Sequence, residues 1–144
     1  WPENIGRDGC RTPMSWDANL KHGGFSEVQP WLPIKKPQLE RAAEQQKDKD
    51  SVLSFYKAMV KFRKNSSALS YGNTKFFESK EPILSFSRKT NDENLICFFN
   101  LSKEEVSLPI EGLKEINNHP HLNAKAEEKL LRLGPNGFCF FLQI

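Results

Sequence analysis

The sequence predicts an α+β fold in which an irregular segment and helices precede a set of short antiparallel strands. Apolar side chains recur at helical spacing between residues 52 and 63, and short runs of alternating residues separated by turns follow residue 72. Residues 1–37 show neither period. With 144 residues the chain has the size of one domain, or of a small domain with an attached segment, so two large domains are excluded.

The irregular first segment, residues 1–37, holds all three tryptophans and several prolines. Segments of this length without regular structure are uncommon in compact domains and are usually either functional or disordered. Disordered segments are poor in aromatic residues, so we expect this one to be a loop that packs on other elements. The rest of the chain offers little that is large enough to receive it, which suggests that a packing partner is missing.

Two helices are expected next. Residues 38–47 are good helix formers, and a second helix carries an apolar stripe at i, i+3, i+4, i+7 and i+8 spacing, with Asp50 or Ser51 as its cap. The residues of the stripe are Val52, Phe55, Tyr56, Met59, Val60 and Arg63. Because Leu53 and Phe62 lie off the stripe, we expect this helix to pack on more than one side.

Six strands are expected after Gly72, at intervals of about ten residues, which is typical of an antiparallel sandwich or barrel. Their ranges are 74–78, 83–88, 94–100, 105–110, 129–133 and 138–143, and the last two are separated by the turn sequence G-P-N-G. Residues 111–128 have an ambiguous pattern, and we expect them to hold one more irregular strand and a charged loop, A-K-A-E-E-K. Adjacent residues of a strand point to opposite faces, so Phe98 and Phe99 must diverge, as must Phe140 and Phe141.

The composition excludes several classes of function. Apolar residues make up 38% and charged residues 27% of the chain, and the net charge of +3 includes no basic run interleaved with aromatic residues, so nucleic acid is not an expected partner. No stretch is long and apolar enough to cross a membrane. The three cysteines are far apart and odd in number, which favours a reducing, cytoplasmic location.

No metal site or cofactor is expected. The histidines at positions 22, 119 and 121 lie far from every cysteine in the sequence, and a solvated role fits them better than metal binding. Asn65 and Asn100 begin glycosylation-type sequences, but such matches are frequent by chance and the cysteines argue against secretion.

Three motifs carry a family resemblance. G-R-D-G-C-R-T-P-M-S-W-D at residues 6–17, G-G-F-S at 23–26 and P-W-L-P-I at 30–34 closely resemble the α-glucosidase and oligo-1,6-glucosidase branch of the α-amylase family, glycoside hydrolase family 13. The second helix and A-L-S-Y-G at residues 68–72 continue the resemblance. From residue 73 onward only the general strand pattern is similar.

The resemblance implies an enzyme with a (β/α)8 catalytic barrel, an inserted subdomain and a C-terminal β-sandwich, of which this chain is the C-terminal piece. Residues 1–66 would form the end of the barrel, namely the loop after the eighth strand and outer helices. Residues 67–144 would form the sandwich. Active sites of such barrels are built by the loops that follow the strands, so residues 1–37 would contribute to the substrate site.

The resemblance also indicates which site residues the chain holds. Retaining glycosidases need a nucleophile and an acid/base carboxylate about 5 Å apart, and in this family both lie on earlier barrel strands. Neither Asp8 nor Asp17 matches them, so the chain is expected to have no catalytic residue and no activity alone. Arg7 matches an arginine that, with an aspartate of the first barrel loop, holds the terminal glucose hydroxyls. Arg11, Asp8 and Trp16 are second choices for substrate binding, and the alternative is that all four only brace the loop.

The sequence therefore predicts a piece of a cytoplasmic α-glucosidase, with an α-linked glucose disaccharide or oligosaccharide as substrate and the rest of the barrel as partner. Without that barrel, we expect residues 1–65 to be disordered or to self-associate through exposed apolar surface. Two alternatives remain open: a sandwich that binds sugar on its own, and a non-catalytic family relative that serves as a protein partner.

Overall fold

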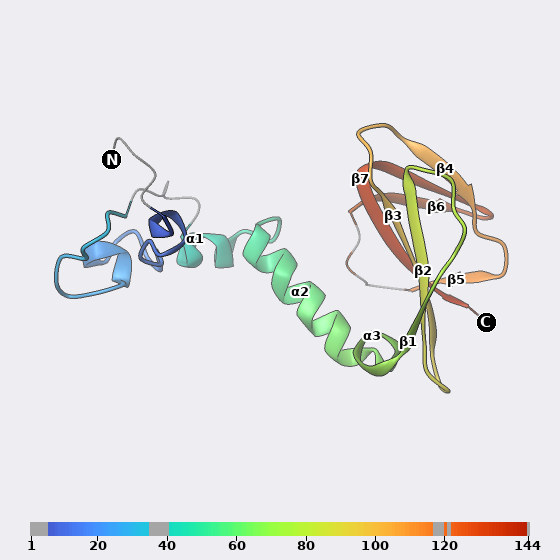
Figure 1. Cartoon of the computed structure of the whole chain (residues 1–144), viewed down its shortest axis with the longest axis horizontal. Helices are drawn as coiled ribbons and strands as arrows, with labels where there is room; N and C mark the ends of the chain where they lie inside the picture. Colours follow the sequence, from blue (N-terminus) through green and yellow to red (C-terminus); the bar gives the residue numbers. More distant parts are fainter. Residues whose placement is uncertain (1–5, 35–40, 117–119, 121, 144) are drawn as a thin grey trace. The chain divides into compact units, whose positions relative to one another are not determined.

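The computed structural model describes residues 6–34, 41–116, 120 and 122–143. The chain divides into two compact units, unit 1 at Trp1–Lys57 and unit 2 at Ala58–Ile144 (Figure 1). Unit 1 holds the irregular segment and the first helix, whereas unit 2 holds every strand that the structure describes.

Residues 6–34 of unit 1 are irregular, as predicted, and contain only two short 3-10 helices, η1 (Asp8–Cys10) and η2 (Lys21–Gly24). The segment supplies its own backbone hydrogen bonds at the turn between them. The nitrogen of Trp16 donates to the carbonyl of Gly23 at 2.8 Å, and the nitrogen of Gly23 donates to the carbonyl of Leu20 at 3.0 Å. These bonds close residues 16–23 into a folded loop.

Helix α1 (Ala42–Lys47) is shorter than the predicted helix over residues 38–47. Residues 38–40 lie outside the described part of the chain. Arg41 is extended, with φ −79° and ψ 147°, so the helix begins only at Ala42, which is buried. Asp48 is also extended and ends the helix after Lys47.

Helix α2 (Val52–Asn65) confirms the second predicted helix and continues two residues beyond its stripe. Ser51 is its cap: the Oγ atom accepts from the nitrogen of Ser54 at 3.2 Å and donates to the carbonyl of Gln45 at 2.6 Å. The Gln45 side chain adds a second cap by accepting from the nitrogen of Leu53 at 3.0 Å. Ser51, and not Asp50, is therefore the cap, because it accepts from the nitrogen of Ser54. The two hydrogen bonds to Gln45 tie the start of α2 to α1.

The apolar stripe of α2 is not buried along its length. Val52 is 80% exposed and Tyr56 is 66% exposed, whereas Met59 and Phe62, nearer the C-terminal end, pack against a buried cluster of unit 2. The helix thus forms from its own pattern and caps, and Met59 and Phe62 are the residues that pack it against unit 2.

A third helix, α3 (Ser67–Tyr71), follows directly and was not predicted as a separate element. Ser66 caps it by accepting a hydrogen bond from the nitrogen of Leu69 at 3.0 Å. Gly72 ends it at a point where a Cβ atom would lie 2.5 Å from the carbonyl oxygen of Ala68. Only glycine fits there, so the chain can turn directly from α3 into the first strand.

The strands of unit 2 form one curled seven-stranded sheet in which every pairing is antiparallel (Figure 1). Its path runs β1-β2-β3-β7-β4, and β5 and β6 also pair with β7. The strands are β1 (Asn73–Phe76), β2 (Ile83–Lys89), β3 (Asn94–Asn100), β4 (Val106–Pro109), β5 (Leu113–Glu115), β6 (Leu122–Glu127) and β7 (Leu130–Gln143). Strand β3 has the predicted bounds.

The predicted break at G-P-N-G is wrong, because β7 runs through these residues as one strand. Its first half pairs with β4 and β6, and its second half pairs with β3, β5 and Leu122 of β6. At the junction, a Cβ on Gly137 would lie 2.6 Å from the carbonyl of Asn123, and Asn136 has a φ of 52°. The glycine permits a close backbone approach between β6 and β7, so the sequence bends the strand and does not end it.

Residues 111–128 contain two strands, β5 and β6, and not one strand with a charged loop. The A-K-A-E sequence lies inside β6, and only Glu128 and Lys129 form the turn into β7. Both alanines of β6 pack against a buried cluster, while Lys125 and Glu127 form an exposed ion pair of 2.6 Å. The period-2 pattern of β6 is weak in the sequence because two of its three apolar residues are alanines.

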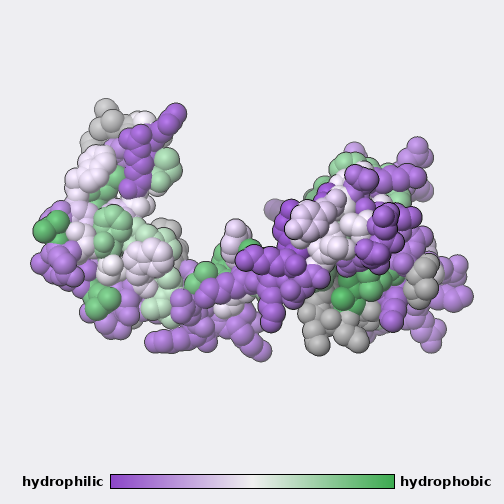
Figure 2. All heavy atoms as spheres, turned by 90° about the horizontal axis from the view of Figure 1, so that it is seen from below, coloured by the Kyte–Doolittle hydropathy of each residue, from purple (hydrophilic) through white to green (hydrophobic). Residues whose placement is uncertain are grey.

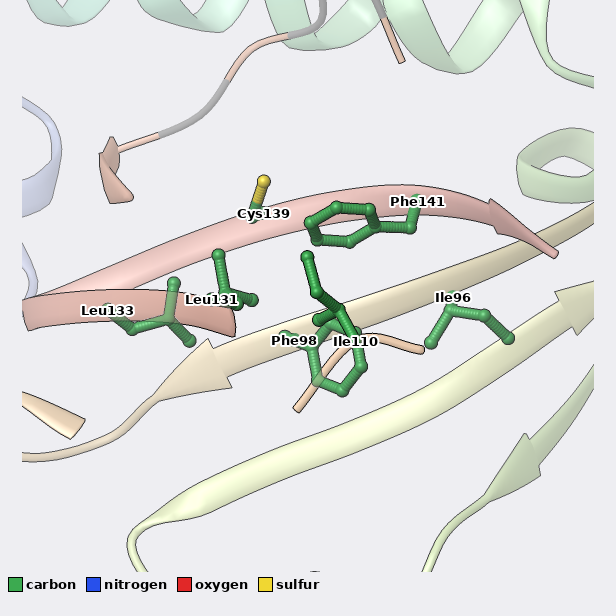
Figure 3. Close-up of a cluster of buried hydrophobic side chains, with 7 residues drawn as sticks. All are labelled: Ile96, Phe98, Ile110, Leu131, Leu133, Cys139 and Phe141. Carbon is green, nitrogen blue, oxygen red and sulfur yellow. The ribbon is translucent and has the colours of Figure 1, made fainter. Parts of the chain in front are cut away.

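The two faces of the sheet carry separate cores. One face is buried as the cluster in Figure 3, formed by Ile96, Phe98, Ile110, Leu131, Leu133, Cys139 and Phe141. The other face buries Ala68, Leu95, Cys97, Phe138 and Phe140, against which Met59, Phe62, Leu69 and Phe99 pack. Phe98 and Phe99 therefore lie on opposite faces, as do Phe140 and Phe141, which confirms the prediction. Burial of each such aromatic side chain stabilises the fold by about 1.5–3 kcal/mol.

Candidate functional site

The predicted site residues Arg7, Asp8 and Arg11 lie together on one turn. The nitrogen of Cys10 donates to the carbonyl of Arg7 and the nitrogen of Arg11 donates to the carbonyl of Asp8, each at 3.1 Å, which closes the 3-10 helix η1. The two arginines are exposed and Asp8 is half-buried. The turn therefore presents two cations and one carboxylate within five consecutive residues.

None of these three side chains makes a hydrogen bond or an ion pair with another residue of the described part of the chain. The contrast with Asp17 is clear, since its Oδ1 atom accepts from the nitrogen of Asn19 at 2.8 Å and from the Asn19 side-chain amide at 3.1 Å. The Asp17 side chain stabilises the loop, whereas the side chains of Arg7, Asp8 and Arg11 form no such contact with the described residues.

Cys10 belongs to the same turn, and Trp16 follows it in the loop. Cys10 is a free, exposed thiol whose Sγ atom donates to the carbonyl of Arg7 at 3.0 Å. Trp16, the remaining predicted contact, is 51% exposed even though its backbone is fixed to Gly23. An exposed aromatic ring on a well-anchored backbone is suited to packing against a ligand or another segment.

The sequence did not predict a hydrogen-bonded pair, Ser15 and Arg41, that joins this loop to the start of helix α1. Ser15 is 1% exposed, and its Oγ atom accepts a hydrogen bond of 3.0 Å from the Nε atom of Arg41. Nothing in the motif distinguishes this serine from its exposed neighbours, and Arg41 lies 26 positions away in the chain. Only the fold reveals that they meet.

Unit 1 also has a hollow of about 350 Å³. It is lined by His22, Gly23, Gln29, Pro30, Pro33, Ile34 and Arg41. Arg7, Asp8 and Arg11 are not among these residues, so the hollow and the turn are separate features of the loop.

Other candidate sites lack support in the described residues. No group of three or more metal-binding side chains occurs within residues 6–34, 41–116, 120 and 122–143, and His119 and His121 lie outside them. Asn100 is 2% exposed, and its side-chain amide donates to the carbonyls of Glu104, Leu133 and Gly134. Asn100 is therefore a structural residue of unit 2.

Among the residues that the structure describes, two ionisable groups have clearly shifted pKa values, and both lie in the sheet. Burial raises the pKa of the Cys97 thiol to about 12, against a smaller opposing effect of the Arg88 charge. A hydrogen bond from Lys125 lowers the pKa of Glu127, with help from the charges of Lys125 and Arg132. Neither group belongs to the turn of Arg7. In the described part of the chain, no helix has the length and apolar character needed to cross a membrane.

Comparison with known proteins places this loop in a family. The catalytic-domain model of the α-amylase family matches residues 1–72, half of the chain. A probable α-glucosidase of Rhizobium meliloti is 43% identical over 122 residues, which cover 83% of this chain and 22% of that protein. A glucan 1,6-α-glucosidase of Streptococcus pneumoniae is 36% identical over 110 residues, which cover 75% of this chain and 20% of the relative.

Solved structures agree with the sequence matches. An α-glucosyl transfer enzyme, XgtA, superposes with a TM-score of 0.84 at 31% identity and covers 100% of this chain, which spans 27% of that protein. The trehalulose synthase MutB of Pseudomonas mesoacidophila has a TM-score of 0.72 at 26% identity, with 94% of this chain and 26% of MutB covered. In sequence and in fold, this chain belongs to the α-amylase family.

Proposed function

We propose that the chain is the C-terminal piece of an α-glucosidase that hydrolyses α-linked glucosides. Residues 1–66 would be the end of its (β/α)8 barrel, and residues 67–144 its C-terminal β-sandwich. The proposal is supported by the matches to proteins named α-glucosidase and glucan 1,6-α-glucosidase, of which this chain spans 22% and 20% of the length. A variant of MutB has been solved with the substrate sucrose, so a structural relative binds an α-glucoside.

The turn of Arg7 would bind substrate in this enzyme. The observation that carries this role is that the Arg7 side chain is exposed and makes no hydrogen bond or ion pair within the described part of the chain. A guanidinium group offers a rigid fork of donors that can meet a carboxylate and neighbouring sugar hydroxyls together. Arg7 would hold the terminal glucose, and Asp8 and Arg11 would add contacts from the same turn.

Bond cleavage would be performed by carboxylates outside this chain. A retaining glycosidase needs one carboxylate to attack the anomeric carbon and a second to protonate the leaving oxygen, about 5 Å apart. The residues that match the family motif here supply binding and orientation only. The chain alone would therefore hold a sugar at best weakly and would not break its glycosidic bond.

The rest of the barrel would be the partner of unit 1. Figure 2 shows apolar side chains in green between polar ones in purple on the surface of this unit. The large exposed apolar residues of the loop are Met14, Trp16, Leu20, Phe25, Val28 and Trp31. Exposed apolar groups in this number are typical of surfaces that another element covers. In the absence of the barrel, we expect the chain to self-associate through the same surface. We also propose that the enzyme is cytoplasmic.

A hydrolysis assay tests the proposal. The 144-residue chain and a longer protein that contains it together with the upstream barrel would be assayed with p-nitrophenyl α-glucoside and with isomaltose. The account predicts turnover by the longer protein and only the buffer rate for the chain. An inactive, well-folded longer protein would refute the α-glucosidase assignment. Turnover by the chain, abolished by mutation of one of its own acidic residues, would refute the proposal that the catalytic carboxylates lie outside it.

A further inference from the structure

We propose that the hydrogen-bonded pair of Ser15 and Arg41 is a positioning element that holds the substrate-binding turn of Arg7 in place. This inference rests on the proposed function, because it gives the pair a role in sugar binding. Ser15 lies within the motif at residues 6–17 but is not one of the predicted site residues, and Arg41 lies outside the motif. The inference is carried by the internal geometry of unit 1.

Ser15 and Trp16 join the loop to helix α1 through three hydrogen bonds. The Nε atom of Arg41 donates to Ser15 Oγ at 3.0 Å, the nitrogen of Ala42 donates to the carbonyl of Ser15 at 3.2 Å, and the nitrogen of Ala43 donates to the carbonyl of Trp16 at 2.8 Å. The first nitrogens of a helix have no partner inside the helix. Here two of them bind the loop backbone, so α1 fixes the loop and the loop caps α1.

The backbone of Gly23 also lies close to Ser15. A Cβ atom at this position would lie 3.0 Å from Ser15 Oγ, and the φ of Gly23 is +65°, which glycine adopts without strain. The carbonyl of Gly23 accepts from the nitrogens of Trp16 and Asp17 at 2.8 and 3.1 Å. The Ser15 hydroxyl thus lies close to both Arg41 and Gly23, and a side chain at position 23 would crowd it.

Burial alternates along the segment that leads from the pair back to the turn. Pro13 and Ser15 are buried, whereas Thr12, Met14 and Trp16 are exposed. A segment anchored at every second residue on one side presents the intervening side chains on the other side. Only residues 12–14 separate this anchor from Arg11, so a shift of Ser15 would displace the end of η1.

A small displacement of Arg7 would strongly affect the reaction, because a misplacement of about 1 Å in an enzyme site can lower the rate about a hundredfold. Removal of the Ser15 hydroxyl would leave the half-buried Arg41 Nε–H without this acceptor. The loop would then relax, and the cost would appear chiefly in sugar binding through Arg7.

The test combines two readouts. In the longer protein, Ser15→Ala, Arg7→Ala and the double variant would be compared by kcat/KM for p-nitrophenyl α-glucoside, with Ser26→Ala as the matched control. Ser26 lies in the same loop, and the one hydrogen bond of its hydroxyl to another described residue is accepted from the nitrogen of Val28, two residues away. In the same longer protein, hydrogen exchange of residues 6–24 would report the order of the loop independently of activity.

We expect Ser15→Ala to lower kcat/KM about fivefold to thirtyfold, and to lower it no further when Arg7 is already alanine. Hydrogen exchange of the loop should quicken in Ser15→Ala and stay unchanged in Ser26→Ala. Losses that multiply in the double variant would overturn the positioning role. An Arg7→Ala enzyme with unchanged kinetics would instead refute the proposed function of Arg7, while the exchange data would still show whether the pair orders the loop.

Discussion

The carboxylate of Glu93 accepts a hydrogen bond of 2.8 Å from the backbone nitrogen of Ala68, so an acidic residue before β3 caps helix α3. The same oxygen accepts from the hydroxyls of Ser66 and Ser67 at 2.9 and 3.1 Å. At the other end of α3, the Arg88 guanidinium donates to the carbonyls of Ala68 and Leu69 at 3.1 and 3.3 Å. Arg88 of β2 and Glu93 of the turn that follows therefore hold α3 by opposite charges that match the helix dipole.

Replacement of this carboxylate should destabilise unit 2. Glu93→Ala removes a charged acceptor with three donors, and we expect a loss of about 1.5–3 kcal/mol in the free energy of unfolding, measured by urea denaturation. Asp92→Ala is the matched control, because Asp92 is exposed and its side chain makes no hydrogen bond within the described residues. Equal stability of the two variants would show that the Glu93 cap contributes nothing.

Asn100 is a second structural residue whose loss should be costly. Its amide nitrogen donates to three carbonyls, and its Oδ1 atom accepts from the nitrogen and hydroxyl of Ser102 at 3.0 and 2.9 Å. Asn100→Ala would leave buried carbonyls at the bend of β7 without donors, so we expect a loss of about 2–4 kcal/mol. Thermal unfolding of this variant beside exposed Asn65→Ala would measure it, and matched melting temperatures would contradict the role.

The Cys97 thiol predicts a specific loss of stability at high pH. Its pKa rises from 9.0 to about 12 on folding, so below pH 9 the thiol is protonated in both states and its contribution is constant. Between about pH 9 and 12 the unfolded chain releases a proton that the folded chain retains, which favours unfolding. The stability of the wild type should therefore fall more steeply than that of Cys97→Ala over this window. Parallel profiles would contradict the burial effect.

The two units should differ in resistance to protease. Unit 2 has two buried clusters and a closed network of strand pairs, whereas unit 1 exposes large apolar side chains. Limited proteolysis with mass spectrometry should therefore give early cuts before Ala68 and a resistant C-terminal fragment. If residues 1–65 of a monomer at low concentration resist equally, unit 1 is stable without a covering partner.

Local patterns in the sequence were sufficient for part of the fold. Helix α2 and strand β3 follow directly from period and caps, and the divergence of Phe98 and Phe99 follows from strand geometry. These features depend on neighbours within a few residues. Helix α3 was missed because its stability comes from Glu93 and Arg88, which are distant in sequence.

The errors have physical causes in long-range contacts. The G-P-N-G sequence has the chemistry of a turn, but close approach to Asn123 and pairing on both sides keep it within β7. Strand β6 has alanines where a clear pattern needs larger side chains. For the candidate site, the motif located Arg7, Asp8 and Arg11 on one turn, while the contact of Ser15 with Arg41 required the folded loop.

The kinetics of Arg7→Ala in the longer protein test the central claim most directly, namely that this chain supplies substrate-binding residues to an α-glucosidase. Loss of a charged hydrogen bond to the sugar should lower kcat/KM about tenfold to a hundredfold while the melting temperature stays unchanged. Arg7→Lys should recover only part of the loss, since an ammonium lacks the planar fork. Wild-type kcat/KM in a well-folded Arg7→Ala enzyme would contradict the account.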